Sequence, residues 1–140
     1  MMISSRGRYA LRVMIDLAEH ADEGCLPMKE VAQRQSISLK YLEKIMPLLV
    51  AAKLVTGTHG KGGGYRLNRE PGDYTVGSIL KLTEGSLAAV SCTAQGPSAC
   101  ARTTCCQTKP MWDKLDAMID GFFEGITLEN LLENNNQPEL

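Results

Sequence analysis

The chain has 140 residues, 44% hydrophobic and 22% charged, a composition typical of a single globular domain. Its longest apolar run, residues 46–52, is far too short to cross a bilayer, and no basic segment leads into an apolar stretch at the start. These features argue against a membrane protein, and we expect no secretory signal and a cytoplasmic location. Five cysteines, an odd number, argue against a disulfide framework in that reducing compartment.

The net charge of −1 conceals a separation of charge along the chain. Residues 1–70 carry eleven Lys or Arg against seven Asp or Glu, a balance of +4, whereas residues 71–140 carry four against nine, a balance of −5. A basic front half predicts an anionic partner for that half.

Two helices are predicted at the start of the chain. Apolar residues recur at helical spacing over residues 6–21, and Gly24 ends the pattern. Pro27 then lies near the first turn of a short helix over residues 28–35, where its fixed φ is tolerated.

A third helix is predicted over residues 39–53, with Ser38 as its N-cap. Pro47 lies inside this pattern, so we expect a kink or a shortened start. If this is the second helix of a helix-turn-helix, its first turns face base edges and phosphates in the major groove. The candidate DNA-binding residues on it are Ser38, Lys40, Tyr41, Glu43 and Lys44. Two lysines four residues apart are also what an ordinary solvated helix face carries.

Segments 54–56 and 64–67 alternate between apolar and polar residues and flank a tip with four glycines between residues 60 and 64, which predicts a β-hairpin. On this hairpin His59, Lys61 and Arg66 are candidates for contact with a neighbouring groove or the DNA backbone. Arg8 on the first helix is a further candidate. The string GKGGG is not a phosphate-binding P-loop, because a glycine follows the lysine where a Ser or Thr is needed.

The back half predicts further helices. Thr75 caps one over residues 76–85, and a long apolar stripe runs from Met111 to Ile126. Thr127 begins a last short helix. The order of elements predicts a mainly α fold, a winged helix-turn-helix with an appended helical half.

Four segments closely resemble the bacterial winged-helix regulators that include the iron–sulfur cluster regulator IscR, with NsrR, RirA and CymR: SSRGRYALRVMIDLA, SISLKYLEKI, KLVTGTHGKGGGYRL and ITLENLL. The resemblance runs from about residue 1 to residue 133. It implies a homodimeric transcription regulator, a repressor or an activator, that binds a pseudo-palindromic operator in double-stranded DNA. It further implies that the long helix pairs across the two-fold axis and that Glu43 takes part in base discrimination.

With this resemblance the chain divides into four parts. Residues 1–84 form the winged helix-turn-helix DNA-binding region, and residues 85–107 form a cysteine-rich sensor loop. Residues 108–133 hold the dimerisation helix and the short C-terminal helix. Residues 134–140 form a flexible tail.

Four of the five cysteines lie within residues 92–106. Many of the related regulators hold an iron–sulfur cluster on three cysteines of this loop. Here Cys92, Cys100 and Cys106 have the spacing C-x7-C-x5-C, most similar to RirA-type regulators. The resemblance therefore implies a 2Fe-2S or 4Fe-4S cluster on these thiolates, which are ligands suited to iron–sulfur clusters. Cys105 is an alternative ligand, and the isolated Cys25 is interpreted as structural or incidental.

The fourth ligand departs from the family pattern. Lys109 stands where IscR-like proteins have a histidine, and Arg8 stands where NsrR-like proteins have an acidic residue. Neither is an iron ligand, because both side chains stay protonated. A water, an external thiol, Cys105 or a carboxylate such as Asp113 remain as candidates.

Several alternatives stay open for the cysteines. A cluster-free thiol-redox regulator or a zinc-bound regulator of the same fold would also use clustered thiols, and an inert loop is the remaining case. An enzyme is disfavoured because both histidines lie in the front half, away from the thiols. A protein-interaction module is a further rival, which salt-dependent DNA binding would exclude.

Overall fold

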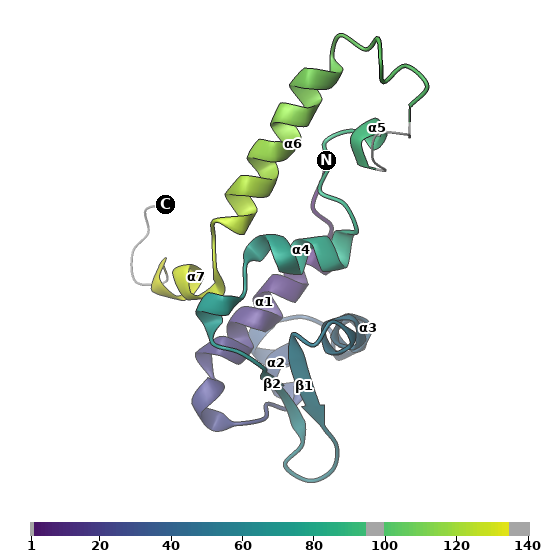
Figure 1. Ribbon diagram of the computed structural model, residues 1–140. Helices are drawn as coiled ribbons and strands as arrows, with labels where there is room; N and C mark the ends of the chain where they lie inside the picture. Colours follow the sequence, from purple (N-terminus) through teal and green to yellow (C-terminus); the bar gives the residue numbers. More distant parts are fainter. Residues whose placement is uncertain (1, 95–99, 135–140) are drawn as a thin grey trace.

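The computed structural model describes residues 2–94 and 100–134. A winged helical region lies at one end, and the long helix α6 extends from it toward the cysteine-bearing segment at the other (Figure 1). The helices are α1 (Ser5–Glu19), α2 (Met28–Gln35), α3 (Leu39–Ala51), α4 (Val76–Glu84), α5 (Ser91–Ala94), α6 (Lys109–Glu124) and α7 (Leu128–Asn134), with 3-10 turns η1 (Ala21–Glu23) and η2 (Pro71–Asp73). Strands β1 (Val55–Thr58) and β2 (Gly64–Leu67) form an antiparallel pair. The predicted mainly α, winged helix class is confirmed. Across the described ranges, every helix is too short or too polar to cross a membrane.

One apolar core holds the helix-turn-helix together. Its buried side chains come mainly from α1, α2, α3 and the turn between the last two: Ala10, Val13, Met14, Leu17, Val31, Ile37, Leu42, Ile45, Met46 and Leu49. Burying one large aliphatic side chain of this kind contributes on the order of 2 kcal/mol. The packing of these faces, rather than helix propensity alone, sets the angle at which α3 is presented.

Helix α3 runs unbroken through Pro47 and begins at Leu39, so the expected shortened start is not found. Proline lacks the amide hydrogen that would bond to the carbonyl of Glu43, four residues earlier. Glu43 and Pro47 are both exposed, so this carbonyl lies on the solvent side of the helix and water can satisfy it.

The hairpin is tied to the helices by a close backbone contact. Leu26 and Tyr65 exchange two main-chain hydrogen bonds, 2.8 and 2.9 Å long. Gly64 has a φ of 156°, and a Cβ at this position would lie 2.3 Å from the Leu26 carbonyl oxygen. The glycine is therefore required for the wing to approach the loop after α1.

The last helix returns to the winged region. The Val76 amide donates to the Ile126 carbonyl at 2.8 Å, and the Leu128 amide donates to the Tyr74 carbonyl at 3.0 Å. Leu128 is fully buried in the same core as α1. Asn134, the first residue of the predicted flexible tail, is the last residue of α7, and the rest of that tail lies outside the described residues.

A polar junction joins α4 to the C-terminal end of α6. The Lys81 ammonium donates to Glu124 Oε1 at 2.9 Å and also pairs with Asp120, while the Thr75 hydroxyl donates to Glu124 Oε2 at 2.7 Å. Hydrogen bonding to Asp120 and Glu124 raises the pKa of Lys81, and hydrogen bonding from Lys81 lowers the pKa of Glu124. A Cβ on Gly77 would lie 2.6 Å from Glu124 Oε1, so a larger residue there would displace the Glu124 carboxylate.

Candidate DNA-binding face and cysteine pocket

The outer face of α3, the recognition helix, carries the charged residues predicted to contact DNA. Ser38 Oγ accepts a hydrogen bond from the Tyr41 amide at 3.2 Å and so caps the helix. Because the apolar residues of α3 face the core, Lys40, Glu43 and Lys44 lie exposed on its opposite side. Ser38 therefore has a structural role as an N-cap in addition to its predicted contact with DNA.

Tyr41 is half-buried in a cluster that joins the first three helices. Its ring meets Tyr9 edge-on, with the ring centroids 5.3 Å apart. The Arg12 guanidinium lies 5.5 Å from the centroid of the Tyr9 ring and donates to the Gln35 side chain at 3.2 Å and to its carbonyl. The position of Tyr41 on the recognition helix thus depends on α1 and α2.

A buried carboxylate at Asp16 holds α2 against α1. Asp16 is fully buried. Arg34 Nη2 donates to Asp16 Oδ1 at 2.6 Å and Arg34 Nε to Oδ2 at 3.1 Å, while Gln35 Nε2 donates to Oδ2 at 2.9 Å. Hydrogen bonding to Asp16 raises the pKa of Arg34. Sequence reasoning missed this network, although an acidic residue inside the apolar stripe of the first helix was a usable signal.

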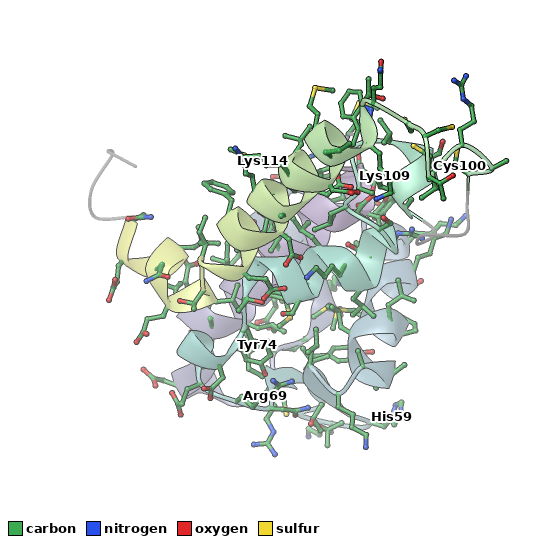
Figure 2. The ribbon with its side chains drawn as sticks, turned by 45° about the horizontal axis from the view of Figure 1, so that its top comes forward. His59, Arg69, Tyr74, Cys100, Lys109 and Lys114 are labelled. Atoms are coloured by element: carbon green, nitrogen blue, oxygen red, sulfur yellow. The ribbon has the colours of Figure 1, made fainter. Side chains whose placement is uncertain are left out.

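The wing exposes its cations at the end of the molecule that carries α3. His59, Lys61 and Arg66 are exposed. Arg69, which was not predicted, is also exposed, with its guanidinium 4.9 Å from the centroid of the Tyr74 ring. His59 and Arg69 lie at one end of the molecule (Figure 2). This end therefore combines a recognition helix with a basic hairpin.

The arginines at the start of α1 differ in their surroundings. Arg6 Nη2 donates to the Thr83 carbonyl at 2.6 Å and so binds α1 to α4. Arg8 is exposed, and its guanidinium donates to the nearby Ser5 hydroxyl at 3.1 Å. Both arginines are exposed, and Arg6 is the one whose guanidinium is bound to another helix.

Three of the cysteines line one pocket. Cys92 from α5, Cys100 and Cys106 surround an open pocket with an empty volume of about 310 Å³. Its other lining residues are Thr93, Thr103, Thr108, Lys109 and Trp112. Cys105 is exposed and does not line this pocket; it lines an adjoining opening with Cys100 and Cys106. The structure thus brings together the three thiols that were predicted as ligands. Residues 95–99, within the predicted sensor loop, lie outside the described ranges.

The surroundings of Cys106 favour its thiolate form. Its Sγ lies 3.3 Å from the Thr108 hydroxyl, and this hydrogen bond is the largest cause of a lowered Cys106 pKa. The Thr108 and Lys109 amides and the charge of Arg102 act in the same direction. Thiolates are the form in which cysteine binds metals and reacts with oxidants.

The fit of this pocket to a metal group is mixed. Three thiols are the right donors for an iron–sulfur cluster, but within residues 2–94 and 100–134 no three or more Cys, His, Asp or Glu side chains lie close enough to hold a metal ion. Among the candidates for a fourth ligand, Asp113 is exposed and forms an ion pair with Lys109. Cys25 lies apart from these thiols, with its Sγ 3.0 Å from the Thr58 hydroxyl of β1.

The apolar stripe predicted over residues 111–126 divides into two faces. Ile119 and Phe123 pack against Val76, Leu80 and Leu87. A second row on α6 is 37–63% exposed and consists of Met111, Leu115, Met118 and Phe122. We call this row the α6 stripe. Large apolar side chains in one exposed row are a typical mark of an interaction surface.

The cysteine pocket and the candidate DNA-binding face lie at opposite ends of the molecule. Figure 1 places the hairpin and α3 at one end, with the segment before α6 at the other. In the rotated view, Cys100 and Lys109 again lie far from His59 (Figure 2). A winged helix-turn-helix with a separate second site is the architecture of a DNA-binding transcription regulator.

The chain belongs to the Rrf2 family, described as iron-dependent transcriptional regulators, whose profile matches residues 3–134. It is 38% identical over 140 residues to the HTH-type transcriptional regulator IscR of Photobacterium profundum, covering 100% of this chain and 80% of that protein. Among solved structures, IscR of T. potens matches with a TM-score of 0.79 and 34% identity, covering 100% of this chain and 92% of that one. CymR, the global cysteine regulator of B. subtilis, matches with a TM-score of 0.77 and 31% identity, covering 95% and 97%. The family consists of DNA-binding transcription regulators and not of enzymes.

Proposed function

We propose that the protein is a homodimeric transcription regulator that binds a pseudo-palindromic operator and senses iron, redox or nitrosative state through an iron–sulfur cluster. The ligands in this proposal are Cys92, Cys100 and Cys106. The observation that carries it is the convergence of these three thiols on one pocket. The description of the family as iron-dependent supports the same conclusion.

The DNA-binding part of the proposal rests on the exposed face of α3 and the wing. Lys40 and Lys44 neutralise phosphates or donate to guanine edges, and Glu43 accepts from a cytosine amino group. His59, Lys61 and Arg66 of the wing contact the adjacent groove or backbone. Salt-dependent affinity is the expected signature, because each phosphate contact releases counterions.

Dimerisation is proposed through the α6 stripe. These side chains have no covering partner among the described residues of the chain, and a second copy related by a two-fold axis presents the same apolar row. Pairing of α6 helices would bring two recognition helices into one assembly, one for each half-site.

A bound cluster would supply a redox-active iron centre that oxygen, nitric oxide or iron loss can alter. The chain's own residues prepare its site: Thr108 favours the Cys106 thiolate, and Trp112 covers one wall of the pocket. Cluster binding would reposition the segments that carry the thiols, which form no single-ion metal site among the described residues. Such a movement acts at the start of α6, whose other end is held to α4 by Lys81. It would thereby change the relative placement of the two DNA-binding regions.

Anaerobic purification tests the cluster directly. We expect the wild type to be coloured, with iron and acid-labile sulfide in near-equal amounts, and Cys100→Ala to be colourless. Cys25→Ala is the matched control, since Cys25 lies apart from the pocket, and it should keep the colour. A Cys100→Ala protein that retained iron and sulfide like the control would contradict the ligand assignment.

A second candidate is a cluster-free regulator that responds through thiol oxidation. The lowered Cys106 pKa favours it, as does the likeness to CymR. A colourless wild type that cannot be reconstituted, yet loses DNA affinity on oxidation and regains it with a thiol reductant, would select this function. Zinc analysis of the same sample distinguishes a zinc-bound regulator, which contains zinc, from a metal-free thiol-redox regulator.

A further inference from the structure

Leu39 is a large apolar residue exposed on the recognition helix. It is the first residue of α3 and is 39% exposed, directly after the Ser38 cap. Among the described residues, the other large exposed apolar side chains are Met2, the α6 stripe and Val50. Met2 lies at the start of the chain, and the α6 stripe is the proposed dimer surface. The two remaining exposed apolar residues, Leu39 and Val50, both belong to α3.

The two residues occupy different ends of the helix. Val50, also 39% exposed, lines a small pocket with Gly57, Thr58, His59 and Tyr65 and so faces the wing. Leu39 lies one turn before Glu43 and one turn before the buried Leu42, at the border between the exposed and the buried faces of the helix. The first turn of a recognition helix is the part that reaches base edges, and there Leu39 is the apolar member of an otherwise polar group.

The chemistry of the major groove limits what such a residue can read. Base edges there offer hydrogen-bonding groups, with the 5-methyl group of thymine as the apolar exception. A leucine side chain has no donor or acceptor. Residues one turn apart on a helix lie about 5–6 Å apart, which corresponds to one or two base-pair steps of about 3.4 Å.

Building on the proposed DNA-binding function, we propose that Leu39 is a specificity-determining residue that packs against a thymine methyl group. This thymine lies one or two base pairs from the cytosine contacted by Glu43. The contact deepens the specificity of the same face: Glu43 reads a cytosine by hydrogen bonding, and Leu39 reads its neighbour by apolar packing.

The test replaces thymine by deoxyuridine, which removes only the methyl group. An operator is first selected from a random duplex DNA library with the wild-type protein at fixed salt. Each thymine of the selected half-site is then replaced in turn, and Kd is measured by fluorescence anisotropy for the wild type, Leu39→Ala, Leu39→Met and Val50→Ala. Circular dichroism melting confirms that each variant is folded.

For wild type we expect about a fourfold loss of affinity at one thymine, the value for one buried methyl-sized group. Leu39→Ala should bring this ratio close to one, whereas Leu39→Met and the matched control Val50→Ala should keep it. A methyl preference that is unchanged in Leu39→Ala, or that no thymine exhibits, overturns the inference while leaving the proposed function intact. A library from which no sequence is enriched overturns both.

Discussion

At the scale of single residues, Asp16 determines how the recognition helix is presented. Its carboxylate is fully buried and accepts four side-chain hydrogen bonds of 2.6–3.2 Å from Arg34 and Gln35 in α2. A buried charge of this kind is tolerated only when it is paired and hydrogen-bonded. Because α2 and α3 form the helix-turn-helix, the ion pair fixes that unit on α1.

Arg34→Met should lower the free energy of unfolding by about 3 kcal/mol, since it leaves a buried carboxylate without its cation. Glu30→Gln is the matched control, because Glu30 pairs with the same guanidinium at 3.8 Å but its side chain is 57% exposed. It should cost no more than about 0.5 kcal/mol. Urea unfolding at neutral pH, followed by circular dichroism, measures both. Equal small losses in the two variants would show that the buried pair contributes little.

At the scale of elements, the polar junction of Lys81, Glu124, Asp120 and Thr75 sets how α6 leaves the winged region. It connects α4 of the winged region to the C-terminal end of α6, the helix that follows the cysteine-bearing segment. The sequence did not indicate it, because Lys81 precedes its partners by about forty residues, with 43 separating it from Glu124.

The lowered pKa of Glu124 predicts a pH dependence of stability. A carboxyl group whose pKa is lower in the folded than in the unfolded state stabilises the fold above the unfolded value, ordinarily 4.5, and loses this contribution as the pH falls through the folded pKa. Wild type should therefore be more stable than Glu124→Gln at pH 7, and the difference should shrink below pH 4.5. Exposure of the pair keeps the difference small, of the order of 0.5 kcal/mol.

Thermal unfolding from pH 7 down to pH 3 checks this. Lys81→Met provides the control, because it removes the main cause of the lowered pKa. Replacing Glu124 in a Lys81→Met background should then change stability by little at any pH. If the stability difference between wild type and Glu124→Gln instead grew toward acid pH, its sign would be wrong. The ion pair with Lys81 would then not be the source of that difference.

At the scale of the whole molecule, the two sites lie at opposite ends and are joined by α6 (Figure 1). The cysteine-bearing segment is joined to the winged region through α6 and through residues 85–90, which connect α4 to α5. In the proposed dimer the α6 stripe is the surface on which that helix pairs, so assembly and sensing involve the same element.

Met118→Glu should convert the dimer to monomer at micromolar concentration, because it places a charge within an apolar interface. Ala117→Glu adds the same charge to the exposed side of α6 next to the stripe and should leave the dimer intact. Size-exclusion chromatography with light scattering distinguishes the two. If both variants remain dimeric, the proposed surface is wrong; loss of operator affinity in Met118→Glu alone would connect assembly to DNA binding.

Local patterns account for what could be predicted. Helical periodicity, the Ser38 and Thr75 caps and the glycine-rich wing act over a few residues, so the order of elements and the winged class followed from the sequence. The same holds for the exposed charges of α3, because the side of a helix opposite its buried apolar stripe faces the solvent. Arg69 in the wing was missed because nothing in its neighbourhood marks it as exposed or functional.

The sequence by itself predicted the order of the main elements, because this order depends on spacing along the chain. The recognition face follows from the same spacing and the three thiol ligands from the family resemblance, and both stay predictions. Only the tertiary structure decided which partners meet. It paired Asp16 with Arg34, divided the apolar residues of α6 into a packed face and an exposed stripe, and brought Cys92 and Cys106 to the lining of one pocket. These contacts join residues distant in sequence, and packing of the whole core selects them.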